Sequence, residues 1–306
     1  MNIQSLDEFK EIIRLLKIKY SSSAEPLFLY RGHSDHLSYK LLPGEFRTSQ
    51  GTNSIIRPFN QDELGILNEY IKDSKRSLDT PKSWIEIAQH YGVPTRLMDL
   101  TEDEYVALYF ACCDESKSFP SVWIVNKPQY DKLFFFQEKS VDAKWSSEDI
   151  VGKILNDEIV NIDHDVHNDA EKFIINPFIY RPEWVDFREK NQKSWFMLWG
   201  ARQDELDKIL ESYGSIPIST DDTVKSCDKS WLGVITVDKR YRGHILDELE
   251  AEYPKSFIYP TDDDHGVRVN KKNYNKSNTQ YRKYVHGGVQ IELKDTNPNK
   301  NKWKEN

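Results

Sequence analysis

The spacing of apolar residues near the first position predicts a helix over residues 6–19. The apolar side chains recur every three or four positions and so share one helical face; they are Leu6, Phe9, Ile12, Ile13 and Leu16. Ser5 and Glu8 form a capping-box pattern at the start of this run, and such a pattern favours a helix start. The first predicted element is therefore an amphipathic helix that begins directly after Ser5.

The rest of the pattern alternates between strands and helices. Short apolar runs predict strands or extended segments at residues 27–31, 95–100, 121–125, 172–180 and 184–199. Apolar residues at helical spacing predict helices at residues 61–77, 83–91, 105–113 and 145–155. Thr101 and Glu104 form a second capping box before the third of these helices, and residues 231–260 predict strand, helix and strand in turn. The mixture predicts an α+β or α/β fold.

Composition and charge narrow the class of protein. The 306 residues include 38% hydrophobic and 12% aromatic residues, which is enough apolar material for a folded core. The net charge of −8 argues against a surface for non-specific nucleic-acid binding, and no apolar run reaches the roughly 20 residues that span a membrane. Three cysteines cannot all pair, which favours the reducing cytoplasm; they are Cys112, Cys113 and Cys227. We therefore expect a cytoplasmic protein that does not span a membrane and has no surface for non-specific nucleic-acid binding, and a local basic groove stays open.

The composition changes near residue 270. Residues 271–306 are polar and rich in asparagine and lysine, which predicts a C-terminal extension with one candidate strand at residues 285–293. We therefore expect one folded domain over residues 1–270, including the N-terminal helix, followed by this polar extension.

The first candidate site is the sequence Arg31-Gly32-His33 at the end of a predicted strand. An arginine presents a planar set of donors, and a glycine lets another backbone or a ligand come close, so this pair suits a phosphate or a carboxylate. The alternative is a structural salt bridge between Arg31 and Asp35 or Glu45, and these residues alone leave both interpretations open.

The second candidate site is residues 89–101, QHYGVPTRLMDLT, which follow a predicted helix. Its polar residues need hydrogen-bond partners where they are buried; they are His90, Tyr91, Thr95, Arg96, Asp99 and Thr101. The partner is either a ligand or the segment itself, with Arg96 paired to Asp99. We expect this segment to share one cleft with Arg31, and Asp99 to be buried and paired with one of the two arginines.

A third candidate pair is Arg188 and Gln192, whose even spacing predicts that both side chains face one side of a strand. The sequence patterns of several large enzyme classes are missing. The chain has no Walker-type phosphate loop, no G-x-G-x-x-G, no H-E-x-x-H and no nucleophile elbow, which disfavours those classes.

Three segments resemble the FRG domain in order and approximate spacing: FLYRGHSD, IAQHYGVPTRLMDLTEDEYVALYFAC and FREKNQKSWF. The resemblance extends over residues 6–270, and its central segment is long enough to be specific. Three positions depart from the family pattern: Tyr30 stands for phenylalanine, Leu100 for an aromatic residue and Ser194 for glycine.

A more distant resemblance is to ADP-ribosyltransferases. A strand ending in YRG, a helix containing VALYFA and the region of Gln192 occur in the order that these enzymes use for their NAD site. The resemblance implies an α+β fold with an ADP-ribosyltransferase-like split β-sheet core and flanking helices, and NAD as the substrate without a metal. It implies catalytic roles for Arg31, His90, Asp99 and Gln192. It implies nucleotide contacts from Arg31, Gly32, His33, Tyr91, Thr95, Arg96 and Arg188.

The resemblance leaves the catalytic acid open. A transferase of this type needs a carboxylate near the ribose, and the Gln192 amide cannot supply that charge. The candidate carboxylates are Asp99, Glu183, Asp186 and Glu189.

Three functions fit these observations. The first is an FRG-domain protein that binds NAD or a related nucleotide and acts as an ADP-ribosyltransferase or NAD glycohydrolase in bacterial or phage defence, with a protein as its target. The second is a non-catalytic module that senses a nucleotide or binds a protein partner in a defence system. The third is a nuclease, which needs clustered carboxylates for a metal ion. A carboxylate that faces Arg31 would separate the first function from the second.

Overall fold

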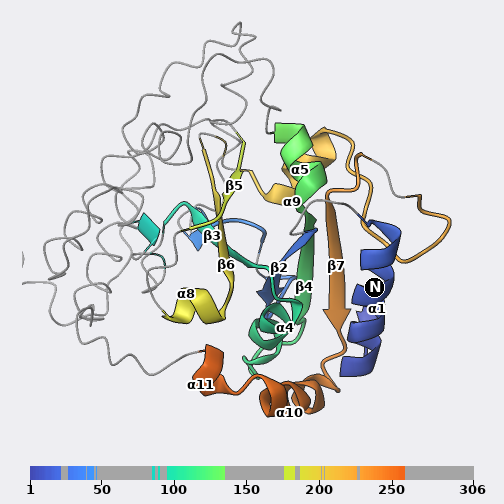
Figure 1. The fold of residues 1–306 in the computed structure, drawn as a ribbon, viewed down its shortest axis with the longest axis vertical. Helices are drawn as coiled ribbons and strands as arrows, with labels where there is room; N and C mark the ends of the chain where they lie inside the picture. The colour runs from blue at the N-terminus through green and yellow to red at the C-terminus, as the bar shows by residue number, and fades with distance from the viewer. Residues whose placement is uncertain are drawn as a thin grey trace, which may run out of the picture.

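The computed structural model describes residues 1–21, 27–38, 40–44, 46, 85–86, 89, 95–134, 176–182, 187–200, 202, 204–225 and 228–258. These residues form a mixed β-sheet with helices packed on both of its faces (Figure 1). None of the helices in this part of the chain combines the length and the apolar character needed to cross a membrane. The fold is thus of the mixed class, with strands and helices together, that the sequence predicts.

Seven strands of the described chain form the sheet in the order β1-β7-β4-β2-β3-β6-β5. The strands are β1 (Asn2–Ile3), β2 (Phe28–His33), β3 (Leu97–Thr101), β4 (Ser121–Asn126), β5 (Phe178–Tyr180), β6 (Ser194–Leu198) and β7 (Leu232–Val237). β1 pairs with β7 in parallel, and every other pair of neighbours in this sheet is antiparallel. The strands predicted at residues 27–31, 95–100 and 121–125 are confirmed, and they lie at the centre of the sheet.

The sheet is nearly divided between β2 and β3. These strands share one residue pair, Tyr30 with Thr101, whereas β2 pairs with β4 over all six of its residues and β3 pairs with β6 over all five. One half of the sheet is therefore β1, β7, β4 and β2, and the other half is β3, β6 and β5 (Figure 1). Because no further pair forms, the facing edges of β2 and β3 need other partners for their backbone groups.

Helices cover both faces of the sheet. α1 (Leu6–Lys19), α4 (Glu104–Cys112) and α10 (Arg242–Glu252) pack on one face with apolar residues of β2, β4 and β7, and α5 (Lys127–Phe134) and α9 (Leu206–Ser212) pack on the other. Two short helices, α8 (Phe187–Asn191) and α11 (Lys255–Ile258), contact each other beside β6. α4 also contacts β2, β3 and β4, so this helix lies where the sheet divides.

The first helix confirms the prediction from apolar spacing and capping. α1 has the predicted bounds, and the Ser5 hydroxyl accepts a hydrogen bond from the backbone N–H of Glu8 at 3.2 Å. The Glu8 carboxylate accepts a hydrogen bond from the backbone N–H of Gln4 at 2.7 Å. Local sequence therefore determines where this helix begins.

The second predicted capping box is wrong. α4 is capped by Asp103, whose carboxylate accepts a hydrogen bond from the backbone N–H of Tyr105 at 3.0 Å. Thr101 instead remains in β3, where it pairs with Ser194 of β6. Because Thr101 is paired within the sheet, Asp103 caps the helix in its place.

Over residues 187–199, the chain differs from the extended segment that is predicted at residues 184–199. It forms α8 and then β6, and between them Lys193 has a φ of 45°, in the left-handed region. The chain turns from helix to strand at this residue. Glycine or asparagine is usual at such a left-handed position, so a lysine there does not signal the turn in the sequence. The prediction that Arg188 and Gln192 face one side of a strand is therefore wrong. The strand predicted after α10 is also wrong over residues 255–258, which form α11.

Several predicted segments lie outside the described residues. They are the helices at 61–77 and 145–155, most of the helix at 83–91 and the extension at 271–306 with its candidate strand. Within the segment 83–91, residues 85, 86 and 89 are helical.

Candidate functional site

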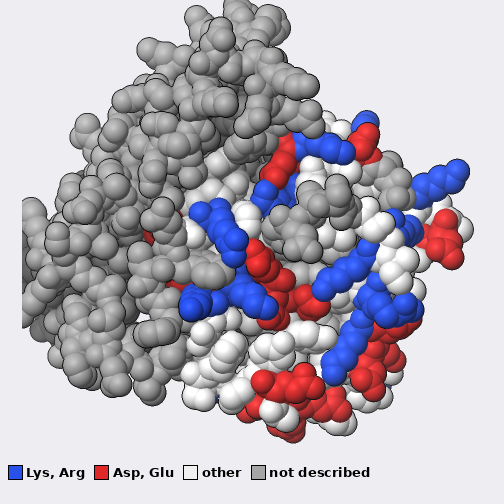
Figure 2. Space-filling view, viewed as in Figure 1, with Lys and Arg blue, Asp and Glu red and all other residues white. Residues whose placement is uncertain are grey.

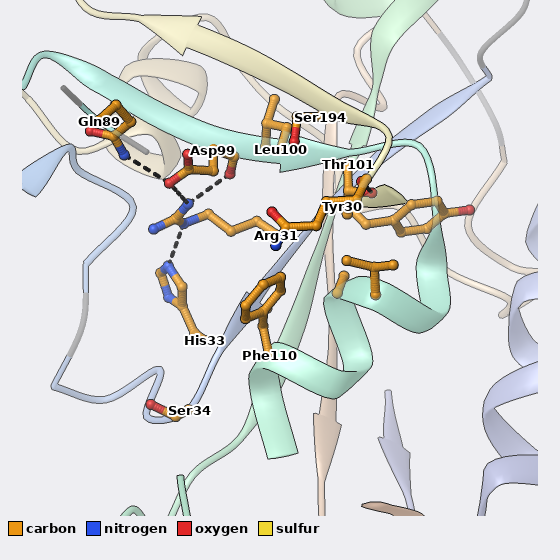
Figure 3. A pocket seen from close by; sticks show the side chains of 14 residues that line it. Tyr30, Arg31, His33, Ser34, Gln89, Asp99, Leu100, Thr101, Phe110 and Ser194 are labelled. Atoms are coloured by element: carbon orange, nitrogen blue, oxygen red, sulfur yellow. Dashed lines mark hydrogen bonds and ion pairs between the residues drawn. The ribbon is translucent and has the colours of Figure 1, made fainter. Parts of the chain in front are cut away.

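A pocket of about 270 Å³ opens where β2 and β3 diverge (Figure 3). The end of β2 forms one wall, and β3 with the start of β6 forms the opposite wall. α4 closes the pocket with Ala107 and Phe110. Among the described residues, those that line the pocket and carry chemistry are Arg31, His33, Ser34, Gln89, Asp99, Thr101, Gln192 and Ser194. The candidate residues on β2 and β3 are thus brought together, although 68 positions separate Arg31 from Asp99.

Arg31 spans the gap between the two halves of the sheet. Its Nη1 donates a hydrogen bond to the backbone oxygen of Asp99 at 2.6 Å, and its Nε donates one to Nε2 of His33 at 3.0 Å (Figure 3). If the antiparallel register continued beyond the one shared pair, Gly32 would lie opposite Asp99. The Arg31 side chain therefore makes a hydrogen bond to β3 where the backbone of β2 makes none. The side chain lines the pocket and is 15% exposed.

His33 supports the guanidinium of Arg31 from below in Figure 3. An arginine can only donate, so the Nε2 atom of His33 accepts, and the imidazole is the neutral tautomer that carries its proton on Nδ1. The ring is buried and meets the indole of Trp123 edge-on, with 6.5 Å between the ring centroids. His33 thus orients Arg31 without adding a second positive charge to the pocket.

Asp99 presents its carboxylate to the pocket beside Arg31. Its Oδ2 accepts a hydrogen bond from Nε2 of Gln89 at 2.8 Å and lies 3.8 Å from Nη1 of Arg31. Within the described part of the chain, Oδ1 accepts no hydrogen bond. The side chain is 51% exposed, so the expected burial of Asp99 is wrong, while its pairing with Arg31 is confirmed.

Gly32 allows α4 to pack directly on β2. A Cβ atom at this position would lie 2.1 Å from the backbone oxygen of Ala107 and 2.7 Å from the backbone nitrogen of Ala111. The backbone that comes close to this glycine is therefore that of a helix, which explains the glycine without a ligand. A nucleotide contact from Gly32 stays a prediction.

Arg96 lies away from the pocket. It is buried, its Nη1 donates a hydrogen bond to the backbone oxygen of Gly200 at 3.0 Å, and its guanidinium lies 5.2 Å from the centre of the Phe46 ring. The expected pairing of Arg96 with Asp99 is replaced by these contacts. The arginines of the two candidate segments thus have separate environments.

Two polar residues at the start of β6 line the end of the pocket. Nε2 of Gln192 donates a hydrogen bond to the backbone oxygen of Ile258 at 2.9 Å, and Ser194 lies opposite Thr101 in the ladder. The Thr101 hydroxyl donates to the backbone oxygen of Gln192 at 2.6 Å and accepts from the backbone N–H of Asp103 at 2.9 Å. These bonds hold the β6 end of the pocket against β3.

Gln89 is a pocket residue that the sequence analysis missed. Its amide joins the hydroxyl of Thr95 to the carboxylate of Asp99, at 2.7 Å and 2.8 Å. Gln89 opens the same segment as the predicted residues, and its only sequence signal is its place one residue before His90. His90, Tyr91 and the side chain of Arg188 lie outside the residues that the structure describes.

Asp99 is the one described carboxylate that lines the pocket. Glu189 is buried on α8 and does not line it, and Glu183 and Asp186 lie outside the described residues. No group of three or more His, Cys, Asp or Glu side chains in the described ranges could hold a metal ion. The arrangement therefore offers one carboxylate, one guanidinium and several neutral hydrogen-bonding groups.

The charges near the start of α4 are mixed. In Figure 2, acidic side chains at the centre of the view lie between basic ones, and more carboxylates gather over α10. Near the start of α4, three acidic residues form ion pairs with basic residues from distant parts of the sequence: Lys17 with Glu104 at 2.7 Å, Lys193 with Asp103 at 3.0 Å, and Arg181 with Glu102 at 3.6 Å. This part of the surface therefore presents no uniform positive field to a nucleic acid.

Comparison with known families identifies the domain. The FRG domain matches residues 26–119, which hold β2, β3 and α4 together with Arg31 and Asp99. No curated protein and no solved structure gives a significant match. The match ends just before β4, so a domain boundary at residue 270 stays a prediction. Residues 26–119 of the chain are thus similar to the FRG domain, and this segment supplies β2, β3 and α4, which form most of the pocket.

Proposed function

We propose that the pocket between β2 and β3 binds NAD or a related nucleotide and cleaves the bond between nicotinamide and ribose. The observation that carries the proposal is the guanidinium of Arg31, which lies beside the carboxylate of Asp99 in one partly exposed pocket. A nucleotide needs both groups, because a guanidinium binds phosphate and a carboxylate accepts hydrogen bonds from ribose hydroxyls. The two side chains come from the two halves of the sheet, so a ligand that touches both joins the halves.

The size and lining of the pocket suit one part of a dinucleotide. Its volume of about 270 Å³ is near the lower end of the range for small-molecule sites. The side chain of Phe110 supplies apolar surface for a flat ring, and Ser34, Thr101 and Gln192 line the pocket with neutral polar groups. We assign this space to the nicotinamide riboside half, with its phosphate toward Arg31.

The order of the elements supports an ADP-ribosyltransferase-like core. The YRG segment lies in the second half of β2, the Thr101 segment forms β3 and leads into the VALYFA helix α4, and Gln192 lies two residues before the start of β6. These strands are neighbours in the order β2-β3-β6, and the sheet divides between the first two. We propose that this division is the split of the core that the resemblance implies.

Asp99 supplies the negative charge near the ribose, which the neutral amide of Gln192 cannot supply. When the bond between nicotinamide N1 and ribose C1′ breaks, the electron pair leaves with neutral nicotinamide and positive charge develops on C1′. The carboxylate of Asp99 stabilises this charge and holds a ribose hydroxyl. Water, or a hydroxyl or amine of an acceptor, then attacks C1′ and releases a proton. The products are nicotinamide and either ADP-ribose or an ADP-ribosylated acceptor.

The test is nicotinamide release from NAD by the purified full chain, followed by chromatography, with calorimetric titration of ADP-ribose. We expect Arg31→Lys to weaken ADP-ribose binding roughly tenfold to a hundredfold, the loss of a charge-assisted hydrogen bond of about 1.5–3 kcal/mol. Asp99→Asn should lower turnover at least a hundredfold, in the range of roughly 10²–10³ seen when one stabilising group is lost. The matched control is Arg240→Lys, because Arg240 is an exposed arginine paired with Asp238 at 2.6 Å and does not line the pocket.

Two results would contradict the proposal. Wild-type protein that binds neither NAD nor ADP-ribose at millimolar concentration would favour a protein-binding module. Wild-type protein that binds ADP-ribose but releases no nicotinamide would leave nucleotide sensing as the function. The carboxylate beside Arg31 favours turnover over both of these outcomes.

A further inference from the structure

We propose that Gln89 and Thr95 are positioning residues that hold the carboxylate of Asp99 in one orientation for the ligand. This inference rests on the proposed function of the pocket. It concerns two side chains that the proposed reaction does not itself require.

A continuous set of hydrogen bonds connects the backbone of β3 to the carboxylate. The backbone N–H of Leu97 donates to the Thr95 hydroxyl at 3.0 Å, and this hydroxyl donates to Oε1 of Gln89 at 2.7 Å. The other end of the Gln89 amide donates from Nε2 to Oδ2 of Asp99 at 2.8 Å. The set therefore begins at a fixed backbone atom and ends at the pocket.

The chemistry at both ends determines how the Gln89 amide is oriented. Rotating the amide by half a turn would bring Oε1 against the Asp99 carboxylate, and two oxygens that only accept hydrogen bonds would then lie in contact. The same rotation would leave the hydrogen of the Thr95 hydroxyl without its acceptor. The observed orientation satisfies all of these groups, so the amide has one favoured state.

The set of hydrogen bonds is buried at Thr95 and exposed to solvent at Asp99. Thr95 is 7% exposed, whereas the Asp99 side chain is 51% exposed. Oδ2 of Asp99 is held by Gln89 and faces Nη1 of Arg31 at 3.8 Å, which leaves Oδ1 for the ligand. A carboxylate that is held in this way needs little reorganisation when the ribose binds, which is how fixed polar groups accelerate reactions.

The experiment compares kcat and KM for nicotinamide release, together with ADP-ribose affinity and melting temperature, in four variants. Gln89→Met and Thr95→Val remove the polar groups and keep similar volumes. Thr95→Ser keeps the hydroxyl and serves as the rescue variant, and Gln4→Met replaces an exposed glutamine outside the pocket as the matched control. A role in folding alone would change the melting temperature and would leave kcat of the folded protein unchanged.

We expect Gln89→Met and Thr95→Val to lower kcat about tenfold, because small misplacements of a reacting group cost one to two orders of magnitude. KM and ADP-ribose affinity should stay within about twofold of the wild type, and Thr95→Ser and Gln4→Met should match it. If the wild type releases nicotinamide and Gln89→Met has the same kcat, the positioning role is overturned and the proposed function stands. A raised KM at unchanged kcat would also overturn it, because Gln89 would then contact the ligand. A wild type without turnover would remove the proposed function and this inference with it.

Discussion

Replacing Gly32 with alanine should destabilise the protein by about 1–2.5 kcal/mol, because the added methyl group has no space. The new Cβ would lie 2.1 Å from the backbone oxygen of Ala107, 2.7 Å from the backbone nitrogen of Ala111 and 2.9 Å from Cβ of Phe110. Real Cβ atoms essentially never come closer than 3.0 Å, so α4 would have to move away from β2 by about 1 Å.

The magnitude follows from the kind of atom that the methyl group meets. Overpacking costs typically 1–3 kcal/mol, and the upper part of this range applies because a helix backbone cannot change rotamer to relieve the contact. Alanine offsets roughly 0.4–1 kcal/mol by restricting the unfolded chain. The remaining ~1–2.5 kcal/mol is a substantial fraction of the roughly 5–15 kcal/mol by which domains are stable.

Urea denaturation followed by tryptophan fluorescence and circular dichroism measures this change in the free energy of unfolding. The matched control is Gly243→Ala in α10, where an added Cβ would meet nothing within 4 Å. Alanine favours helix over glycine by up to about 1 kcal/mol, so this control should leave stability unchanged or raise it slightly. If Gly32→Ala unfolds within 0.5 kcal/mol of the wild type, the close packing of α4 on β2 is refuted.

Two further predictions concern the buried side chains of Thr101 and Cys112. Thr101→Val removes a buried hydroxyl that makes hydrogen bonds with two backbone groups. In urea denaturation it should lower the free energy of unfolding by about 1–3 kcal/mol, and a change below about 0.5 kcal/mol would contradict the two bonds. Burial raises the pKa of the Cys112 thiol to about 12, whereas Cys113 is exposed. In a Cys227→Ser background, a thiol reagent at pH 8 should therefore label one cysteine in the native state and two in denaturant, and rapid native labelling of both would show that Cys112 is accessible.

Elements that depend on local patterns could be predicted from the sequence. α1 has an amphipathic repeat and its own cap, and the central strands β2 and β4 are short apolar runs between polar segments. In each case the signal lies within a few residues of the element itself. Tertiary structure confirms these elements without changing their bounds by more than two residues at either end.

Elements whose bounds depend on distant residues could not be predicted. α4 is capped by Asp103 and not by the predicted Thr101, because Thr101 is still paired with Ser194 of β6. α8 ends at a left-handed turn made by Lys193, which has no glycine or asparagine to signal it. The predicted strand through this turn failed for that reason.

The site was predicted in part. The chemistry of Arg31 and Asp99 marks both residues in the sequence, and strand order brings them to one pocket. Arg96 has the same chemistry in the sequence, but it lies beside Gly200 and Phe46. Gln89 was missed because a neutral amide gains its role only from the two groups on either side of it.

Arg31 and Gly32 are neighbours in the sequence for two reasons: the packing of α4 on β2 requires the glycine, and the division of the sheet requires the arginine. The glycine lets α4 come against β2, and β3 then leaves β2 after the single pair of Tyr30 and Thr101. The guanidinium crosses the resulting gap to the backbone oxygen of Asp99, which a continuous ladder would have paired with the glycine. A side chain in this position connects the halves and also reaches the pocket, so an anion bound there would contact the residue that joins the sheet. Ligand binding and the join between the two halves should therefore be coupled through Arg31.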